Sequence, residues 1–132
     1  MADKTTVQRL SEAFFGAIEN GDMDALHALL TRDVVMRTDG GGKAAAARYP
    51  LEGVAEVTRF LYKVFVAPTH PPPVRPRYIW FNGAPGAVLF DGGKPVSAFH
   101  FQVTDGRIGG IFVQRNPDKL GRFADLAEAG HC

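Results

Sequence analysis

The chain has 132 residues, with 45% hydrophobic and 22% charged side chains, which is the size and composition of one globular domain. Fifteen basic residues face 14 acidic ones, and this near-balance gives no support to direct nucleic-acid binding, which needs a concentrated basic face. The single cysteine, Cys132, excludes an internal disulfide and suits a reducing cytoplasm.

The first half of the chain predicts three helices and one strand. Apolar residues recur at helical spacing over 5–20, and Asn20-Gly21 ends this helix because both residues tolerate left-handed dihedral angles. Asp22 is a suitable N-cap for a second, short helix. Val34–Thr38 reads as the first strand, and apolar spacing over 52–66 predicts the third helix.

The second half is rich in predicted strands, separated by turns that contain glycine. A last helix is expected to begin near Pro117. Helices followed by an antiparallel meander indicate the α+β class, with helices covering one face of a curved sheet. The four strands of the meander are predicted at Arg77–Asn82, Ala87–Phe90, Val96–Thr104 and Arg107–Arg115.

The motif Asp39-Gly40-Gly41-Gly42-Lys43 follows the first predicted strand directly. Three consecutive glycines lose much conformational entropy on folding, and one tight turn needs only one or two of them. The motif is therefore either a flexible exit from the strand or a place where the backbone approaches a ligand or partner closely. A phosphate-binding loop is not indicated, because Ala44 rather than Ser or Thr follows Lys43.

The motif Asn116-Pro117-Asp118-Lys119-Leu120 has the sequence of a helix start. Asn is a favoured N-cap, Pro fits the first helical position, and Asp complements the positive end of the helix. A rigid cap of this kind also presents a defined surface to a partner.

Together the two motifs resemble the C-terminal extension of one group of bacterial extracytoplasmic-function sigma factors, over about Val7 to Phe123. That extension is a SnoaL-like domain of the nuclear transport factor 2-like superfamily. The resemblance implies one domain over residues 1–132, with its core over about 5–127. It also implies a cone-shaped, cystatin-like fold, in which a curved antiparallel sheet wraps around the N-terminal helices and a short C-terminal helix follows. In this superfamily the outer face of the sheet often forms a homodimer.

The resemblance implies a regulatory or ligand-binding module with no sigma core or DNA-binding region of its own. Its implied partners are a sigma core region or RNA polymerase, and a small apolar ligand. In the sigma factors the first motif lies near the junction with the core and the second faces it. We therefore expect Asp39–Lys43 and Asn116–Leu120 to lie close together at one accessible edge.

The alternative is a small enzyme, an isomerase, cyclase or hydrolase, that acts on an apolar substrate with Asp39 as its base. The resemblance to ketosteroid isomerases aligns their base with Asp39, but it aligns their oxyanion Tyr with Phe14, which has no hydroxyl. Their second donor falls near Phe99 or His100, and neither is a carboxylic acid. The Asp-Arg-Asp set of the related hydrolases is incomplete too, because no second Asp stands on the strands beside Arg37 or Arg115.

The sequence offers two candidate catalytic residues, Asp39 and His100. His100 is either an acid or base in the pocket or a hydrogen-bonded structural residue. It alternates with Phe99 and Phe101, so only one of these two sets faces inward. Phe99 and Phe101, or else Phe112, are the candidates for the outer, dimerising face. The residues expected to line the pocket of the cone are Phe14, Asp39, Phe60, Tyr62, Trp80, His100 and Phe112.

No metal or cofactor is indicated, because His27, His70, His100 and His131 lack ligand spacing. The N-terminal residues lack the apolar core of a signal peptide, and no run has the length of a membrane span. We expect no membrane partner.

Overall fold

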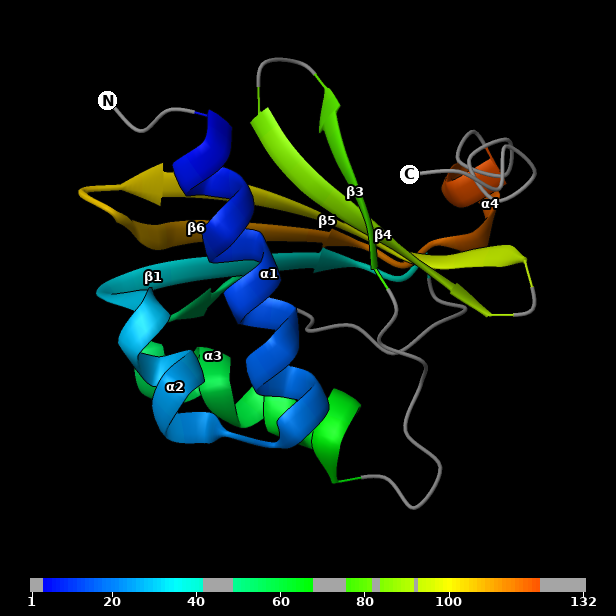
Figure 1. The fold of residues 1–132 in the computed structure, drawn as a ribbon. Helices are drawn as coiled ribbons and strands as arrows, with labels where there is room; N and C mark the ends of the chain where they lie inside the picture. Colours follow the sequence, from blue (N-terminus) through cyan, green and yellow to red (C-terminus); the bar gives the residue numbers. More distant parts are fainter. Residues whose placement is uncertain (1–3, 42–48, 68–75, 82–83, 92, 122–132) are drawn as a thin grey trace.

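A curved mixed sheet forms the frame of the molecule (Figure 1). The computed structural model describes residues 4–41, 49–67, 76–81, 84–91 and 93–121. Within them the strand order is β2-β1-β6-β5-β4-β3. The strands are β1 (Leu30–Asp39), β2 (Leu51–Glu52), β3 (Pro76–Phe81), β4 (Ala84–Asp91), β5 (Lys94–Thr104) and β6 (Arg107–Gln114).

Two kinds of pairing build this sheet. Strands β3 to β6 form the predicted antiparallel meander, and β1 then pairs in parallel with β6. The parallel pair, with Arg37 opposite Phe112 and Asp39 opposite Gln114, was not predicted from the sequence. Neither was β2, which pairs with β1 through only two residues. The fold class is confirmed as α+β.

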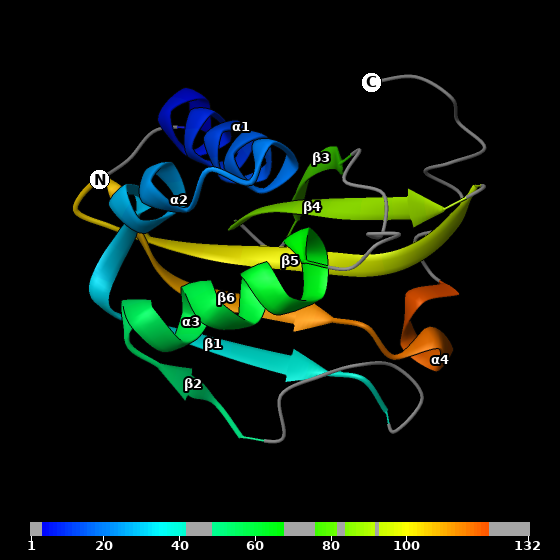
Figure 2. The same cartoon turned by 90° about the horizontal axis from the view of Figure 1, so that it is seen from below.

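The helices α1 (Lys4–Asn20), α2 (Met23–Leu29) and α3 (Val54–Leu61) gather on one side of the sheet (Figures 1 and 2). Gly21 has a φ of 67° between α1 and α2, and Asp22 caps α2 by accepting from the Ala25 N–H at 3.0 Å. The sequence predicted both the end of the first helix at Asn20-Gly21 and the Asp22 cap. No helix in the described part of the chain is long and apolar enough to cross a membrane.

The third predicted helix is divided into α3 and a π-helical turn, η1 (Tyr62–Val66). Residue 52, the first residue of the predicted helix, belongs instead to β2. Such π turns widen a helix locally and redirect its side chains. The turn places Phe65 in the core, where it is 4% exposed, while Tyr62 remains 47% exposed.

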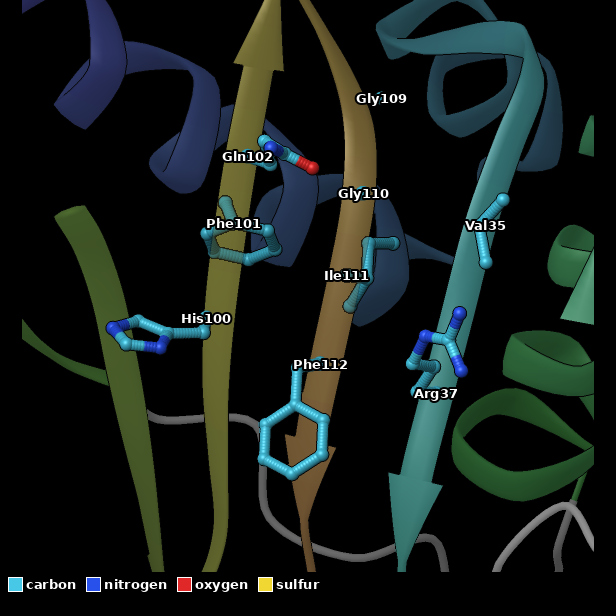
Figure 3. A pocket seen from close by; sticks show the side chains of 9 residues that line it. All are labelled: Val35, Arg37, His100, Phe101, Gln102, Gly109, Gly110, Ile111 and Phe112. Carbon is cyan, nitrogen blue, oxygen red and sulfur yellow. The ribbon is translucent and has the colours of Figure 1, made fainter. Parts of the chain in front are cut away.

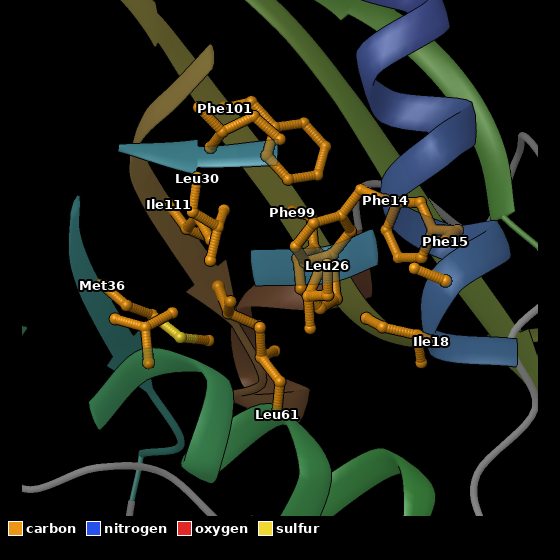
Figure 4. Packing of buried hydrophobic residues seen from close by; sticks show 14 of the residues in the cluster. Phe14, Phe15, Ile18, Leu26, Leu30, Met36, Leu61, Phe99, Phe101 and Ile111 are labelled. Carbon is orange, nitrogen blue, oxygen red and sulfur yellow. The ribbon is translucent and has the colours of Figure 1, made fainter. Parts of the chain in front are cut away.

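An aromatic cluster fills the space between α1 and the sheet (Figure 4). The ring centroid of Phe14 lies 5.0 Å from that of Phe101, and the centroid of Phe15 lies 5.1 Å from that of Phe99. Both pairs meet edge to face, the arrangement that aromatic rings prefer. Because Phe99 and Phe101 point inward, the alternation of β5 turns His100 and Gln102 to the opposite face.

The short helix α4 (Pro117–Leu120) packs on that opposite, outer face. Leu120 is buried there in a second, small cluster with Val88 and Ala98. Figure 1 shows α4 at the end of the sheet, away from α2 and α3. The expected continuation of this helix, with Phe123 and Ala127, lies outside the described residues.

We predict that Phe99→Ala lowers the free energy of unfolding by about 3–5 kcal/mol, because Phe99 is 1% exposed and its removal leaves a cavity among the other rings. Urea unfolding followed by circular dichroism measures this. Phe112→Ala is the control, since Phe112 is 41% exposed and its loss should cost much less. Equal losses for the two variants would contradict the assignment of the core.

Candidate functional site

Asp39 is the last residue of β1, and its side chain lies on the outer face of the sheet. Val34 and Met36 of the same strand are fully buried beneath the helices. Because side chains alternate along a strand, Arg37 and Asp39 point the other way. The carboxylate at the expected base position therefore faces away from the aromatic cluster.

Three donors hold the Asp39 carboxylate. Lys119 Nζ lies 2.8 Å from Oδ2 in an ion pair, Gln114 Nε2 lies 3.4 Å from the same oxygen, and the Gly41 N–H donates to Oδ1 at 3.0 Å. The hydrogen bond from Lys119 lowers the pKa of Asp39 below its ordinary value, and those from Gln114 and Gly41 lower it further, against the opposing effect of burial. A carboxylate that is kept ionised and occupied in this way is a poor general base.

Gly41 brings the first motif against the second. Its φ is 61°, in the left-handed region, and a Cβ built on it would overlap the side chain of Asn116. At least this one glycine therefore has a specific steric role. The backbone joins the two segments as well, since the Arg115 N–H donates to the Asp39 carbonyl oxygen at 2.7 Å.

Asn116 is the N-cap of α4, as predicted. Its Oδ1 accepts from the Asp118 N–H at 3.0 Å, and its own N–H donates to Gln114 Oε1 at 3.0 Å. Gln114 thus contacts both Asp39 and Asn116. We call the set of these interlocked residues the motif junction, which consists of Asp39, Gly41, Gln114, Asn116 and Lys119.

The described parts of the two motifs lie close together, as expected. Gly40 and Leu120 are buried at the junction, while Pro117, Asp118 and Lys119 are exposed beside Gly41. These four exposed residues, Gly41, Pro117, Asp118 and Lys119, are called the motif surface below. Gly42 and Lys43 lie outside the described residues.

The seven residues expected to line one pocket do not share a face. Phe14 is fully buried in the aromatic cluster, and Phe60 is partly buried against it. Tyr62 is exposed on η1. The side chain of Trp80 lies outside the described part. Asp39, His100 and Phe112 are all on the outer face of the sheet, where the alternation of β1, β5 and β6 places them.

His100 and Phe112 line an open pocket of about 480 Å³ on the outer face, which we call the outer-face pocket (Figure 3). It runs across the middle of β1, β6 and β5. Of the three Phe residues considered for the outer face, Phe112 is the one that lies there. The lining residues are Val35, Arg37, His100, Phe101, Gln102, Gly109, Gly110, Ile111 and Phe112.

Arg37 and the pair Gly109-Gly110 were not predicted as parts of a pocket. A usable signal was present in the sequence: Arg37 alternates with the apolar Val34 and Met36 set, and two glycines inside a strand mark a place where the sheet surface is open. Arg115, the other arginine considered beside Asp39, points to the helix side, with its guanidinium carbon 5.8 Å from the Phe65 ring centroid. Burial lowers the pKa of Arg115. In the described residues no group of three His, Cys, Asp or Glu side chains could hold a metal ion.

Comparison with solved structures places this arrangement in a known fold. A nuclear transport factor 2-like protein from Burkholderia xenovorans is 18% identical, with a TM-score of 0.63 over 91% of this chain and 96% of the other. The chain has the nuclear transport factor 2-like fold. Neither a protein-family model nor a curated protein sequence matches it.

Two further solved structures are similar to this chain. The sigma factor SigJ of Mycobacterium tuberculosis is 25% identical, with a TM-score of 0.68 over 90% of this chain and 45% of SigJ. The chain thus spans less than half the length of that sigma factor. A protein assigned as a polyketide cyclase from Sinorhizobium meliloti is 20% identical, with a TM-score of 0.60 over 80% of this chain and 94% of the other.

We predict that Gly41→Ala lowers the free energy of unfolding more than Gly106→Ala does. Both glycines have positive φ, at 61° and 77°, so both substitutions strain the backbone. Only at Gly41 does the new Cβ displace the cap residue Asn116, whereas nothing lies within 4 Å at Gly106. The difference should be about 1 kcal/mol, the typical contribution of an N-cap. Urea unfolding measures it, and equal losses would argue against contact between the two motifs.

We also predict that Lys119→Gln raises the pKa of Asp39 toward its ordinary value of 3.8. Carboxyl ¹³C NMR of the folded protein measures this titration. Because the folded-state pKa is below the unfolded one, the stabilising effect of Asp39 is present above the unfolded pKa and is lost as the pH falls through the folded pKa. An unchanged pKa in the variant would show that Lys119 does not hold this carboxylate.

Proposed function

We propose that this domain is a regulatory module, without catalysis of its own, that contacts a sigma core region through the motif surface. The observation that carries the proposal is the ion pair between Asp39 and Lys119, which locks the two motifs into one exposed edge. The resemblance of those motifs to the sigma-factor extension, and the 25% identity to SigJ over 90% of this chain, support the choice of partner.

The shape of the motif surface suits a protein partner. Pro117 and the cap of Asn116 fix the start of α4, and Leu120 anchors the helix from below. Asp118 and Lys119 are therefore presented from a fixed backbone, so little conformational freedom is lost when a partner binds. A partner in the transcription machinery would place the domain in the cytoplasm.

The enzymatic alternative has less support. A base for an apolar substrate would have to point into the cone and have a donor near the substrate oxygen. Asp39 instead lies on the outer face in an ion pair, and Phe14, Phe99 and Phe101 pack against one another where the substrate would lie. The likeness to the Sinorhizobium protein, at 20% identity, is evidence for the fold alone.

Binding of the intact chain to sigma core regions tests the proposal. The core of each extracytoplasmic-function sigma factor encoded in the same genome is immobilised in turn, and the affinity is measured by biolayer interferometry. Saturable binding to at least one core is expected. If no core binds at micromolar concentrations, the proposed partner is wrong.

Asp39→Asn is predicted to weaken that binding about 3- to 10-fold, or ~0.7–1.4 kcal/mol, because the Lys119 side chain loses the ion pair that holds it in position. Glu56→Gln is the matched control: it removes the carboxylate of another exposed ion pair, Glu56–Arg59 at 3.0 Å, far from the motif surface. Equal affinities for Asp39→Asn and wild type, or an equal loss for Glu56→Gln, would contradict a role of the motif junction.

A further inference from the structure

The outer-face pocket has the composition of a small-molecule site, and nothing in the proposed function uses it. Its volume of about 480 Å³ is within the range of ligand pockets in proteins. Two rows of side chains cross it, because residues paired between neighbouring strands point to the same face. The first row is Arg37, Phe112 and His100, and the second is Val35, Gly110 and Gln102.

The first row places a cation beside an exposed aromatic ring. Figure 3 shows Phe112 on β6 between Arg37 on β1 and His100 on β5. Neighbouring strands are about 4.8 Å apart, so the ends of this row are separated by about 10 Å. Phe112 is 41% exposed, so part of its ring is open to solvent beside the guanidinium of Arg37.

The second row opens the space beside that ring. Gly110 has no side chain, and a Cβ built on it would lie 2.8 Å from Gln102 Oε1. The glycine therefore lets Gln102 extend over β6. Gly86 on β4 has a similar effect next to His100, because a Cβ there would lie 2.6 Å from the Phe99 carbonyl oxygen and 3.3 Å from His100 Cδ2. Three polar side chains thus surround one apolar surface.

The charges of the pocket favour an anion. Arg37 is exposed, and the ion pairs within the described residues join Glu56 to Arg59 and Asp39 to Lys119, which leaves Arg37 without a carboxylate partner. No acidic residue lines the pocket. Among the acids on this face, Asp39 is held by Lys119, Glu52 on β2 pairs with Val35, and Asp33 stands two residues before Val35 on β1.

We propose that the outer-face pocket binds a small aromatic carboxylate. The guanidinium of Arg37 matches a carboxylate with two parallel hydrogen bonds, the ring of the ligand stacks on Phe112, and Gln102 and His100 are placed to contact polar groups at its far end. Arg37 fixes the sign of the ligand charge, and Phe112 selects a flat apolar body.

The test uses 2-naphthoate as the probe and 2-naphthamide as its neutral counterpart, titrated into the full chain and followed by ¹H–¹⁵N NMR. We expect 2-naphthoate to cause saturable shifts of the Gly109, Gly110 and Phe112 amides, and to bind at least about tenfold more tightly than the amide does. Arg37→Gln should abolish that preference. Arg107→Gln, an exposed arginine at the start of the same β6 strand, is the matched control and should retain it.

Gly110→Val fills the pocket without a need for positive φ, since only Gly21, Gly41, Gly53, Gly93 and Gly106 have positive φ among the described glycines. It should abolish binding of both compounds, with folding checked by circular dichroism. Equal binding of the two compounds to wild type, shifts confined to other residues, or no saturable shift would overturn the proposal. The proposal would also be overturned if sedimentation showed that the wild type is a dimer, that this dimer does not bind 2-naphthoate, and that Phe112→Arg dissociates it. A second copy of the chain would then be the occupant of the pocket. None of these results depends on whether a sigma core binds the motif surface.

Discussion

The ion pair between Asp39 and Lys119 is the contact on which the proposed partner surface of this domain depends. It connects the end of β1 to α4, two segments separated by 80 positions in the chain. Gln114 and the close approach of Gly41 to Asn116 add short-range contacts around it. An exposed ion pair alone contributes little to stability, so its importance lies in the position that it gives to α4. The same contact occupies the carboxylate that the resemblance to ketosteroid isomerases aligns with their base.

The sheet separates two different surfaces. Its inner face packs aromatic rings against α1, with Phe14 and Phe99 almost fully buried. Its outer face carries the motif junction and the outer-face pocket side by side, because Arg37 and Asp39 are two residues apart on β1, as are Phe112 and Gln114 on β6. Two residues span about 6.7 Å along a strand. A ligand in the pocket would therefore lie next to the surface that we propose for the partner, and the two strands give a direct structural connection between them.

Much of this fold could be predicted from local signals in the sequence. Helical spacing gave α1 and α2, and turn residues gave the meander of β3 to β6. The parallel pairing of β1 with β6 could not be predicted, because no local pattern names a distant partner strand. The break between α3 and η1 left the apolar spacing intact, so one helix was predicted. The face to which the Asp39 side chain points could be predicted, because Asp39 alternates in phase with Arg37 rather than with the buried Met36. Its contact with Lys119 could not be predicted from the sequence.

Hydrogen–deuterium exchange of the domain, alone and saturated with a sigma core region, tests the central claim most directly. The claim is that the two motifs form one surface that meets the partner. It predicts slower exchange on binding in peptides that cover residues 38–41 and 114–121, and unchanged exchange in α3, where the Glu56–Arg59 pair lies. Protection confined to the helices, or to the middle of β5 and β6, with exchange at both motifs unaltered, would contradict it.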